Sequence, residues 1–263
     1  MTIVTDGLVS EWVAKLATGS GPGVNSPTET TTWVDLVGDH DGAVSGFSYS
    51  DTDGWDGTGT SGDPYNLVSD RTGGMVVLTD HADFKDGSFS VELWMHMNAT
   101  DATNNQVVFD NRHDNTITNG HWFVLVGPTY TFPSLGYRDA SNVSRYLANG
   151  GVDLTDGWNH VVYTHDGTDS KEYVEGEYVA GRDGDGITVR TGSTNPRMFM
   201  TSGGTFAFNG AIATMRYYNR ALGVEEVAAN YAAGVTAAST DSSATFLPHV
   251  MTHHFYPPLI GGR

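Results

Sequence analysis

The sequence predicts an all-β protein in which two antiparallel sheets pack face to face as a sandwich. Short segments of alternating apolar and polar residues recur along the chain, and turn residues separate them. The chain contains 33 glycines and nine prolines, a composition that favours many turns and little helix. Residues 222–231 alone show apolar positions at helical spacing, so a single short helix is expected.

Strands are predicted from the N-terminal region to residue 148, with one long interruption. The first strand candidate is GLVSEWV, residues 7–13. Residues 50–74 are rich in Gly, Asp, Thr and Ser and are predicted to form one long loop, a kind of connection that is usually functional or mobile. Further strands are expected at residues 73–80, 88–97, 106–111 and 121–127, and a hairpin pair at 134–148.

Residues 157–181 predict a three-stranded antiparallel meander. The first strand, 158–164, alternates in side-chain character, as expected of a strand with one buried face. A second strand is expected at 172–174, after which Gly176 can adopt positive φ and reverse the chain. The third strand follows at 178–180.

The last strand and the helix are expected close together near the end of the sandwich. Residues 206–222 predict a long strand, with Asn209 and Gly210 as a turn. In the helix that follows, Glu225 and Glu226 occupy the first turn, where the helix dipole favours acidic residues. Gly234 is a suitable stop.

The remaining chain, residues 235–263, is predicted to be a linker and a C-terminal arm, outside a sandwich domain of residues 1–234. Its end is apolar and aromatic and contains three prolines, so it is expected to dock on its own domain or on a neighbouring subunit. Zinc binding by its histidines is a weaker alternative, because the prolines disfavour a helix that would fix them. The residues expected to make this contact are Phe246, Leu247, His249, His253, His254, Phe255, Tyr256, Leu259 and Ile260.

Charge and composition restrict the classes of partner. Thirteen basic and 31 acidic residues give a formal net charge of −18, which disfavours nucleic acid and anionic membranes. Three lysines stand against ten arginines, and 23 of the acids are Asp; this resembles proteins of salt-loving archaea and their viruses. The alternative is an ordinary acidic surface that prevents association. The absence of cysteine excludes disulfides and thiolate sites.

Neither an export signal nor a membrane-spanning segment is apparent. Residues 1–21 show no basic start followed by an apolar core, and no apolar run approaches about 20 residues. The expected location is therefore a virus particle, which lysis of the host would release.

Three segments together resemble the laminin G-like, concanavalin A-like jelly-roll family. They are SFSVELWM (88–95), GWNHVVYTHDG followed by YVEGEYV (157–179), and NGAIATMRYYNRALGVEEVAANY (209–231). The segments GLVSEWV and TWVDLVGDHDGAVSG resemble the opening strands of such domains in tailed-virus structural proteins. The resemblance covers residues 6–234 and implies a jelly-roll β-sandwich. It does not fix the function, because this fold carries lectins, adhesion modules, enzymes and virion decorations.

Calcium is the expected cofactor if one binds, since clusters of Asp and Asn offer the oxygens that it prefers. The resemblance favours the segment DNRHDN, and hence Asp110, Asn111 and Asp114 as ligands. Two other clusters are Asp51, Asp53 and Asp56, and Asp80, Asp83 and Asp86. The alternative is that all of these are solvated loop acids.

A glycan-binding rim is the second candidate site. Aromatic residues in or near loops can serve as platforms for sugars, and the candidates are Trp55, Tyr65, Trp122 and Tyr130. The alternative is that these residues fill the core of the sandwich. His160 matches a core position of the family and is expected to be structural.

The expected function is non-enzymatic. Glycoside hydrolysis needs two carboxylates across a sugar, but Glu92 is isolated in its strand, and Glu175 and Glu177 straddle Gly176. The leading hypothesis is a structural or decorating virion component of a tailed virus with a halophilic host, assembled with other virion subunits and as a homo-oligomer. The alternative is a calcium-assisted, lectin-like module for cell-surface glycans.

Overall fold

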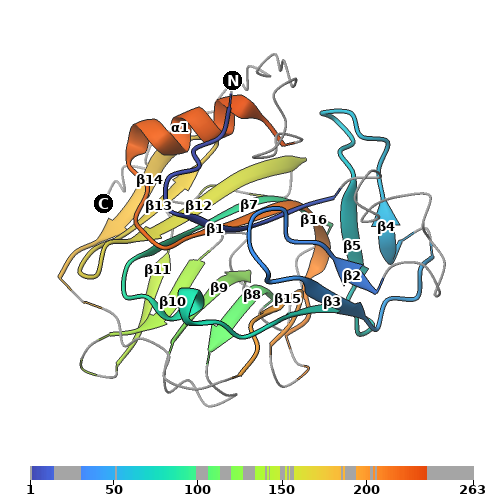
Figure 1. Cartoon of the computed structure of the whole chain (residues 1–263), viewed down its shortest axis with the longest axis horizontal. Coiled ribbons are helices and arrows are strands. Elements are labelled where there is room, and N and C mark those ends of the chain that lie inside the picture. The colour runs from blue at the N-terminus through green and yellow to red at the C-terminus, as the bar shows by residue number, and fades with distance from the viewer. Residues whose placement is uncertain are drawn as a thin grey trace, which may run out of the picture.

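The computed structural model describes residues 2–14, 31–50, 52–98, 106–112, 120–126, 134–139, 141, 143–148, 152, 154, 157–184, 186, 194–201, 204 and 206–235. Within these residues two sheets of eight strands each form a sandwich, and one α-helix covers the outside of one sheet (Figure 1). No helix of this described part is long and apolar enough to cross a membrane. The predicted all-β sandwich with one short helix is therefore confirmed.

The sheet that carries the helix, here the helix-side sheet, has the strand order β14-β13-β12-β7-β16-β5-β4, with β1 also paired to β16. The strand pairs of this sheet are antiparallel. β1 and β5 share one edge of β16, because β1 pairs with residues 214–218 and β5 with residues 209–212. The strands are β1 (Leu8–Val13), β4 (Gly54–Asp56), β5 (Asn66–Asp70), β7 (Phe89–Met97), β12 (Trp158–His165), β13 (Ser170–Val174), β14 (Glu177–Arg182) and β16 (Asn209–Tyr218).

The opposite sheet has the order β11-β10-β9-β8-β15-β6-β3-β2 and is also antiparallel. The predicted hairpin at 134–148 is present as β10 and β11. The strands are β2 (Thr32–Trp33), β3 (Gly42–Ser45), β6 (Met75–Leu78), β8 (Gln106–Arg112), β9 (Gly120–Val126), β10 (Ser134–Arg138), β11 (Ser144–Ala148) and β15 (Arg197–Met198).

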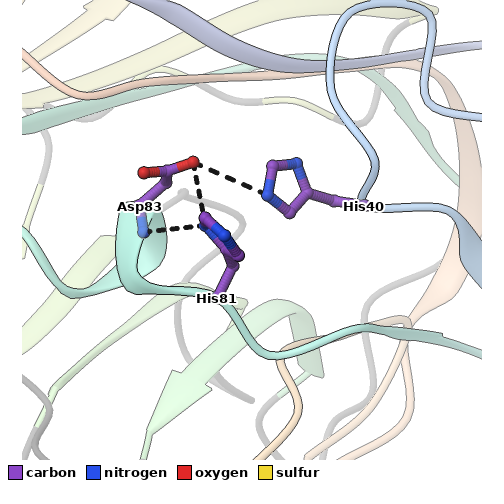
Figure 2. Close-up of side chains that lie close together, drawn as sticks. All are labelled: His40, His81 and Asp83. Atoms are coloured by element: carbon purple, nitrogen blue, oxygen red, sulfur yellow. Dashed lines mark hydrogen bonds and ion pairs between the residues drawn. The ribbon is translucent and has the colours of Figure 1, made fainter.

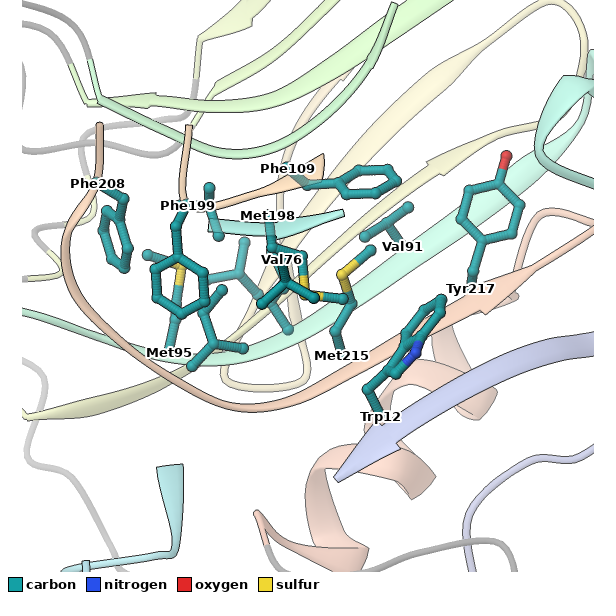
Figure 3. Close-up of a cluster of buried hydrophobic side chains, with 14 of the residues drawn as sticks. Trp12, Val76, Val91, Met95, Phe109, Met198, Phe199, Phe208, Met215 and Tyr217 are labelled. Carbon is teal, nitrogen blue, oxygen red and sulfur yellow. The ribbon is translucent and has the colours of Figure 1, made fainter. Parts of the chain in front are cut away.

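The main core lies between the sheets. Met95 and Met215 from the helix-side sheet meet Val76, Phe109 and Met198 from the opposite sheet, and all five side chains are almost fully buried (Figure 3). Because successive strand residues point to opposite faces, this inward set leaves the alternate residues of β7 and β16 on the outer face of the helix-side sheet.

The meander that the sequence predicts is formed by β12, β13 and β14. Val161 and Tyr163 belong to the main core, whereas Val162 lies in a smaller cluster on the helix side. Glu175 and Gly176 connect β13 to β14 with φ values of 53° and 80°. Positive φ at both residues is what a two-residue type I′ hairpin turn requires, so the predicted reversal at Gly176 is confirmed.

The helix α1 (Val224–Ala233) has the acidic first turn and the Gly234 stop that the sequence predicts, and it lies two residues further along than the predicted segment 222–231. The Glu226 side chain accepts a hydrogen bond from the Gly223 backbone nitrogen at 2.8 Å, which satisfies an otherwise unpaired donor of the first turn. Gly234 ends the helix with a φ of 91°. Val227 and Asn230 face the sheet and are fully buried.

Two predictions about the strands are wrong. Residues 50–74 contain β4 and β5 rather than one long loop; β4 is three residues long, too short to show a period. Asn209 and Gly210 begin β16 rather than forming a turn. A Cβ on Gly210 would lie 2.2 Å from the His96 carbonyl oxygen, so this glycine permits close approach of β16 to β7.

The C-terminal arm lies outside the described residues. All nine arm residues from Phe246 to Ile260 fall in the segment 236–263, which the structure does not describe. The arm and the boundary at residue 234 therefore remain predictions.

Candidate functional site

The predicted calcium ligands do not form an open cation site in the described part of β8. Asp110 is buried, and Arg112 donates to both of its carboxylate oxygens, at 2.6 Å and 2.8 Å. Asn111 donates from Nδ2 to the Phe84 carbonyl oxygen at 2.6 Å. Asp114 lies outside the described residues. The bidentate guanidinium occupies both oxygens that Asp110 would offer to a cation, which disfavours calcium at this residue, and calcium binding by the segment stays a prediction.

The predicted aromatic rim is wrong at Trp55. This side chain is fully buried and makes an edge-to-face contact with Trp33, with ring centroids 5.2 Å apart, so it fills the core. Tyr65 is partly buried, and its ring lies against Gly59. Trp122 pairs through its backbone with neighbouring strands, but its side chain is not described, and Tyr130 lies outside the described residues. Of the four residues, Tyr65 therefore remains a candidate, because its side chain is described and partly exposed.

Glu92 is not isolated, as the sequence suggested, but belongs to a buried charged cluster beneath α1. Arg216 of β16 lies opposite Glu92 of β7 and opposite Glu11 of β1, and all three side chains are fully buried. The Arg216 guanidinium donates to Glu11 at 2.8 Å and to Glu92 from Nη1. Asn230 of α1 donates to the second Glu92 oxygen at 2.6 Å.

This cluster is structural in character. Burial alone would raise the pKa of Glu92, but Arg216, and hydrogen bonds from His160 and Asn230, outweigh it and lower the pKa to about 2. His160 is fully buried, with Nε2 3.2 Å from Glu92, in agreement with a structural role. The carboxylate therefore stays charged, closed to solvent and engaged, so it links β7 and β16 to the helix.

A second cluster of chemically active side chains lies between two loops at the surface. His40 comes from the loop between β2 and β3, and His81 and Asp83 come from the start of the 3-10 helix Ala82–Lys85. Figure 2 shows the three side chains pointing toward one another. Asp83 Oδ2 lies 2.9 Å from His81 Nδ1 and 3.7 Å from His40 Nε2. One ligand atom from each residue lies within 4.8 Å of the others.

A second layer of residues fixes His40. Its Nδ1 lies 3.1 Å from Asp35 Oδ2 and 2.7 Å from Ser10 Oγ. Asp35 also accepts the Glu11 backbone N–H at 2.9 Å. The His40 ring packs edge-to-face on Phe84, with centroids 4.9 Å apart. His40 is thus held rigidly, with 7% of its side chain exposed, whereas 53% of His81 and 40% of Asp83 are exposed.

Sequence patterns indicated one of the three residues in this cluster. Asp83 belongs to one predicted acidic cluster. Among the other described members of the acidic clusters, Asp53 accepts a backbone N–H from Ser48, and Asp80 pairs with Lys85 at 2.8 Å, so both support the fold. The two histidines were missed because they are far apart in sequence. Pairing of β3 with β6 brings their loops together, and this register could not be deduced from the chain.

The family that matches this chain is the Laminin_G_3 family, described as the concanavalin A-like lectin/glucanases superfamily. The match covers residues 70–228, which is more than half of the chain. The chain belongs to this family. The resemblance that the three segments indicated is therefore confirmed at the level of the family, whereas the likeness to tailed-virus proteins stays a prediction. Among curated proteins, no match was found.

Solved structures share the fold at low sequence identity. Domain 4 of the extracellular GH43 arabinanase AbnA from Geobacillus stearothermophilus, solved with arabinotriose, has a TM-score of 0.60 and 15% identity, and the alignment covers 85% of this chain and 98% of that one. The Trypanosoma rangeli sialidase with the inhibitor DANA has a TM-score of 0.59 and 15% identity, and the alignment covers 87% of this chain and 33% of the sialidase. The binding domain of botulinum neurotoxin DC with SialylT has a TM-score of 0.57 and 14% identity, and the alignment covers 86% of this chain and 51% of the toxin domain. This chain thus spans a third of the sialidase and half of the toxin domain.

Proposed function

We propose that this chain is a non-catalytic carbohydrate-binding domain. The observation that carries the proposal is the alignment of nearly the whole sandwich with nearly the whole of an arabinanase domain that was solved with arabinotriose. The other two aligned structures also hold the ligands named in their descriptions, an inhibitor of a sialidase and SialylT. At such low identity the likeness concerns the fold, so the proposal requires direct binding measurements.

The environment of the described carboxylates supports a binding role rather than hydrolysis. A glycosidase places two carboxyl groups about 5–9 Å apart across an open cleft. Glu11 and Glu92 are neighbours, but they share the Arg216 guanidinium and are fully buried. Asp110 is held by Arg112. Each of these acids therefore serves an internal ion pair and is unavailable to protonate or attack a glycosidic bond.

The sugar-binding surface is proposed at the Tyr65 loop, defined as residues 57–65 between β4 and β5. The backbone nitrogens of Thr58, Gly59 and Thr60 all donate to the Asp63 carbonyl oxygen, at 3.0–3.2 Å, which makes the loop compact. Thr58 and Thr60 are exposed, and Gly59 approaches the Tyr65 ring. A partly exposed aromatic ring beside hydroxyl groups offers a sugar both an apolar face and hydrogen-bond partners.

Replacing Tyr65 with alanine should weaken glycan binding by about fivefold or more, since loss of an aromatic anchor costs more than about 1 kcal/mol. A glycan array of the full chain would first identify an oligosaccharide, and calorimetry would then give its affinity. Tyr146 on β11 is 46% exposed, so Tyr146→Ala is a matched control that should bind normally. Absence of binding to every glycan, with and without a chelator, would reject the proposed function. Equal losses in both variants would reject the location.

We also propose that the domain is displayed on a virus particle, and the two roles are compatible. Support comes from the opening segments that resemble tailed-virus structural proteins, the acidic, lysine-poor composition typical of a halophilic host, and the apolar and aromatic segment 246–263. Such a segment would bury apolar surface against a neighbouring subunit. Mass spectrometry of density-purified particles from the source culture should detect the chain at a copy number that matches particle symmetry. Detection only in the soluble or cell-bound fraction would contradict it.

A further inference from the structure

We propose that His40, His81 and Asp83 form a binding site for a divalent transition-metal ion, with zinc as the best match. The site lies on the loops between β2 and β3 and between β6 and β7. It contains none of the residues in the Tyr65 loop. The inference is therefore independent of the proposed sugar binding.

The spacing of the ligand atoms fits a tetrahedral ion. Zinc binds imidazole nitrogen and carboxylate oxygen at about 2.0–2.2 Å, which places neighbouring ligands of a tetrahedron about 3.3 Å apart. Asp83 Oδ2 lies 2.9 Å from His81 Nδ1 and 3.7 Å from His40 Nε2, so these two separations bracket that value. The three ligand atoms lie within 4.8 Å of one another. A rotation of the exposed His81 side chain would close the remaining gap.

The hydrogen-bond pattern directs electron pairs at one point. His40 Nδ1 faces the Asp35 carboxylate at 3.1 Å, and since a carboxylate only accepts, Nδ1 carries the proton and Nε2 has a lone pair. His81 Nδ1 accepts the Asp83 backbone N–H at 3.3 Å, so it too has a lone pair, which a metal ion would take over from that N–H. Both nitrogens point toward the Asp83 carboxylate (Figure 2). His40 Nε2 and Asp83 Oδ2 are thus two acceptors that face each other at 3.7 Å, and a cation between them would satisfy both.

The residues around His40 match those that support a metal ligand. A metal-bound histidine commonly donates its second ring nitrogen to a carboxylate, which fixes the tautomer and the ring orientation. Asp35 provides this carboxylate, and it is itself held by the backbone nitrogens of Glu11 and Val37. Phe84 packs against the ring. These contacts hold the His40 ring in one orientation, so that it is prearranged for a metal ion.

The chemistry of the ligands selects a transition metal over calcium. Calcium takes six to eight oxygen ligands, whereas two imidazoles and one carboxylate suit zinc and related ions. Because His81 and Asp83 are each at least 40% exposed, water can complete the coordination. The bound ion would join the two loops to each other at one end of the sandwich.

The test is titration of the full-length chain, dialysed against a chelator, with zinc chloride in a calorimeter. The expected result is one site that Asp83→Asn and His81→Gln each weaken by at least about tenfold. Asp86→Asn removes the same charge three residues further along, and His96→Gln removes a histidine on β7; both are matched controls and should change the affinity less than about twofold. Calcium chloride should give no heat from this site.

The tail histidines provide the decisive comparison. In a variant with His249→Gln, His253→Gln and His254→Gln, zinc binding to the proposed site should be retained, and His81→Gln in that background should abolish it. Loss of zinc binding in the tail variant, or equal affinity of the parent chain and the Asp83→Asn and His81→Gln variants, would overturn the proposal. A circular dichroism spectrum of each variant separates loss of a ligand from loss of the fold.

Discussion

Replacing Arg216 with methionine is expected to lower the free energy of unfolding by about 3–5 kcal/mol, because it removes the positive charge that two buried carboxylates share. Glu11 and Glu92 are both fully buried and both accept from this guanidinium. Methionine approximates the length of the side chain, so most of the packing is kept. Asn230 and His160 would still contact Glu92, whereas Glu11 would lose the guanidinium that donates to it at 2.8 Å.

Chemical denaturation of the parent chain and the variant gives this difference. Arg220→Met is the matched control, since Arg220 is 27% exposed and pairs with Glu226 at the surface, where an ion pair contributes about 1 kcal/mol or less. A further variant combines Glu11→Gln, Glu92→Gln and Arg216→Met. It should regain much of the lost stability, because none of these three buried positions then carries a charge. If Arg216→Met were no worse than Arg220→Met, the cluster would not be the internal anchor described here.

The segments with strong periodicity predicted the fold well. β7, β12 and the run from β16 to α1 combine long alternating strands with a recognisable corner and helix, so their residues alone identified the family. Trp55 was misplaced for a physical reason. Its segment is glycine-rich and its strand has three residues, so nothing local shows that its neighbour in space is Trp33, from β2 in the other sheet.

The candidate sites were less predictable because each depends on contacts between distant strands. Glu92 seemed isolated because Glu11 and Arg216 join it only through the pairing of β1 and β7 with β16. His40 and His81 meet through the pairing of β3 with β6. An excess of Asp in the sequence also offers many acidic clusters, and spacing along the chain does not distinguish the ones held by an arginine, such as Asp110, from Asp83.

Glu172→Gln is expected to stabilise the protein at alkaline pH and to remove a strong pH dependence. Glu172 lies on β13 opposite Tyr163 and is fully buried. The Tyr163 hydroxyl donates to Oε1 at 3.3 Å, whereas Oε2 is buried without a hydrogen-bond partner among the described residues. Burial raises the pKa of Glu172 to about 9, although the Tyr163 hydrogen bond acts in the opposite direction.

The sign of the effect follows from proton binding. The unfolded chain loses this proton near the ordinary pKa of 4.5, but the folded chain keeps it up to about pH 9. Between these values the folded state binds more protons, so stability falls as pH rises, by up to about 1.4 kcal/mol per pH unit. Between pH 7 and pH 8.5 the loss is about 2 kcal/mol. A glutamine keeps the shape and has no proton to lose, so its stability should stay level across the same interval.

Urea unfolding of both proteins at pH 7, 7.75 and 8.5 measures this slope. The interval avoids His165, because burial lowers the pKa of His165 and the side chain is neutral above pH 7 in both the folded and the unfolded state. Glu177→Gln, on the adjacent strand β14, is the matched control, since Glu177 is exposed and its replacement should leave the slope unchanged. Parallel pH profiles for the parent chain and Glu172→Gln would mean that Glu172 is ionised in the folded state, and hence that water or a cation reaches this part of the core.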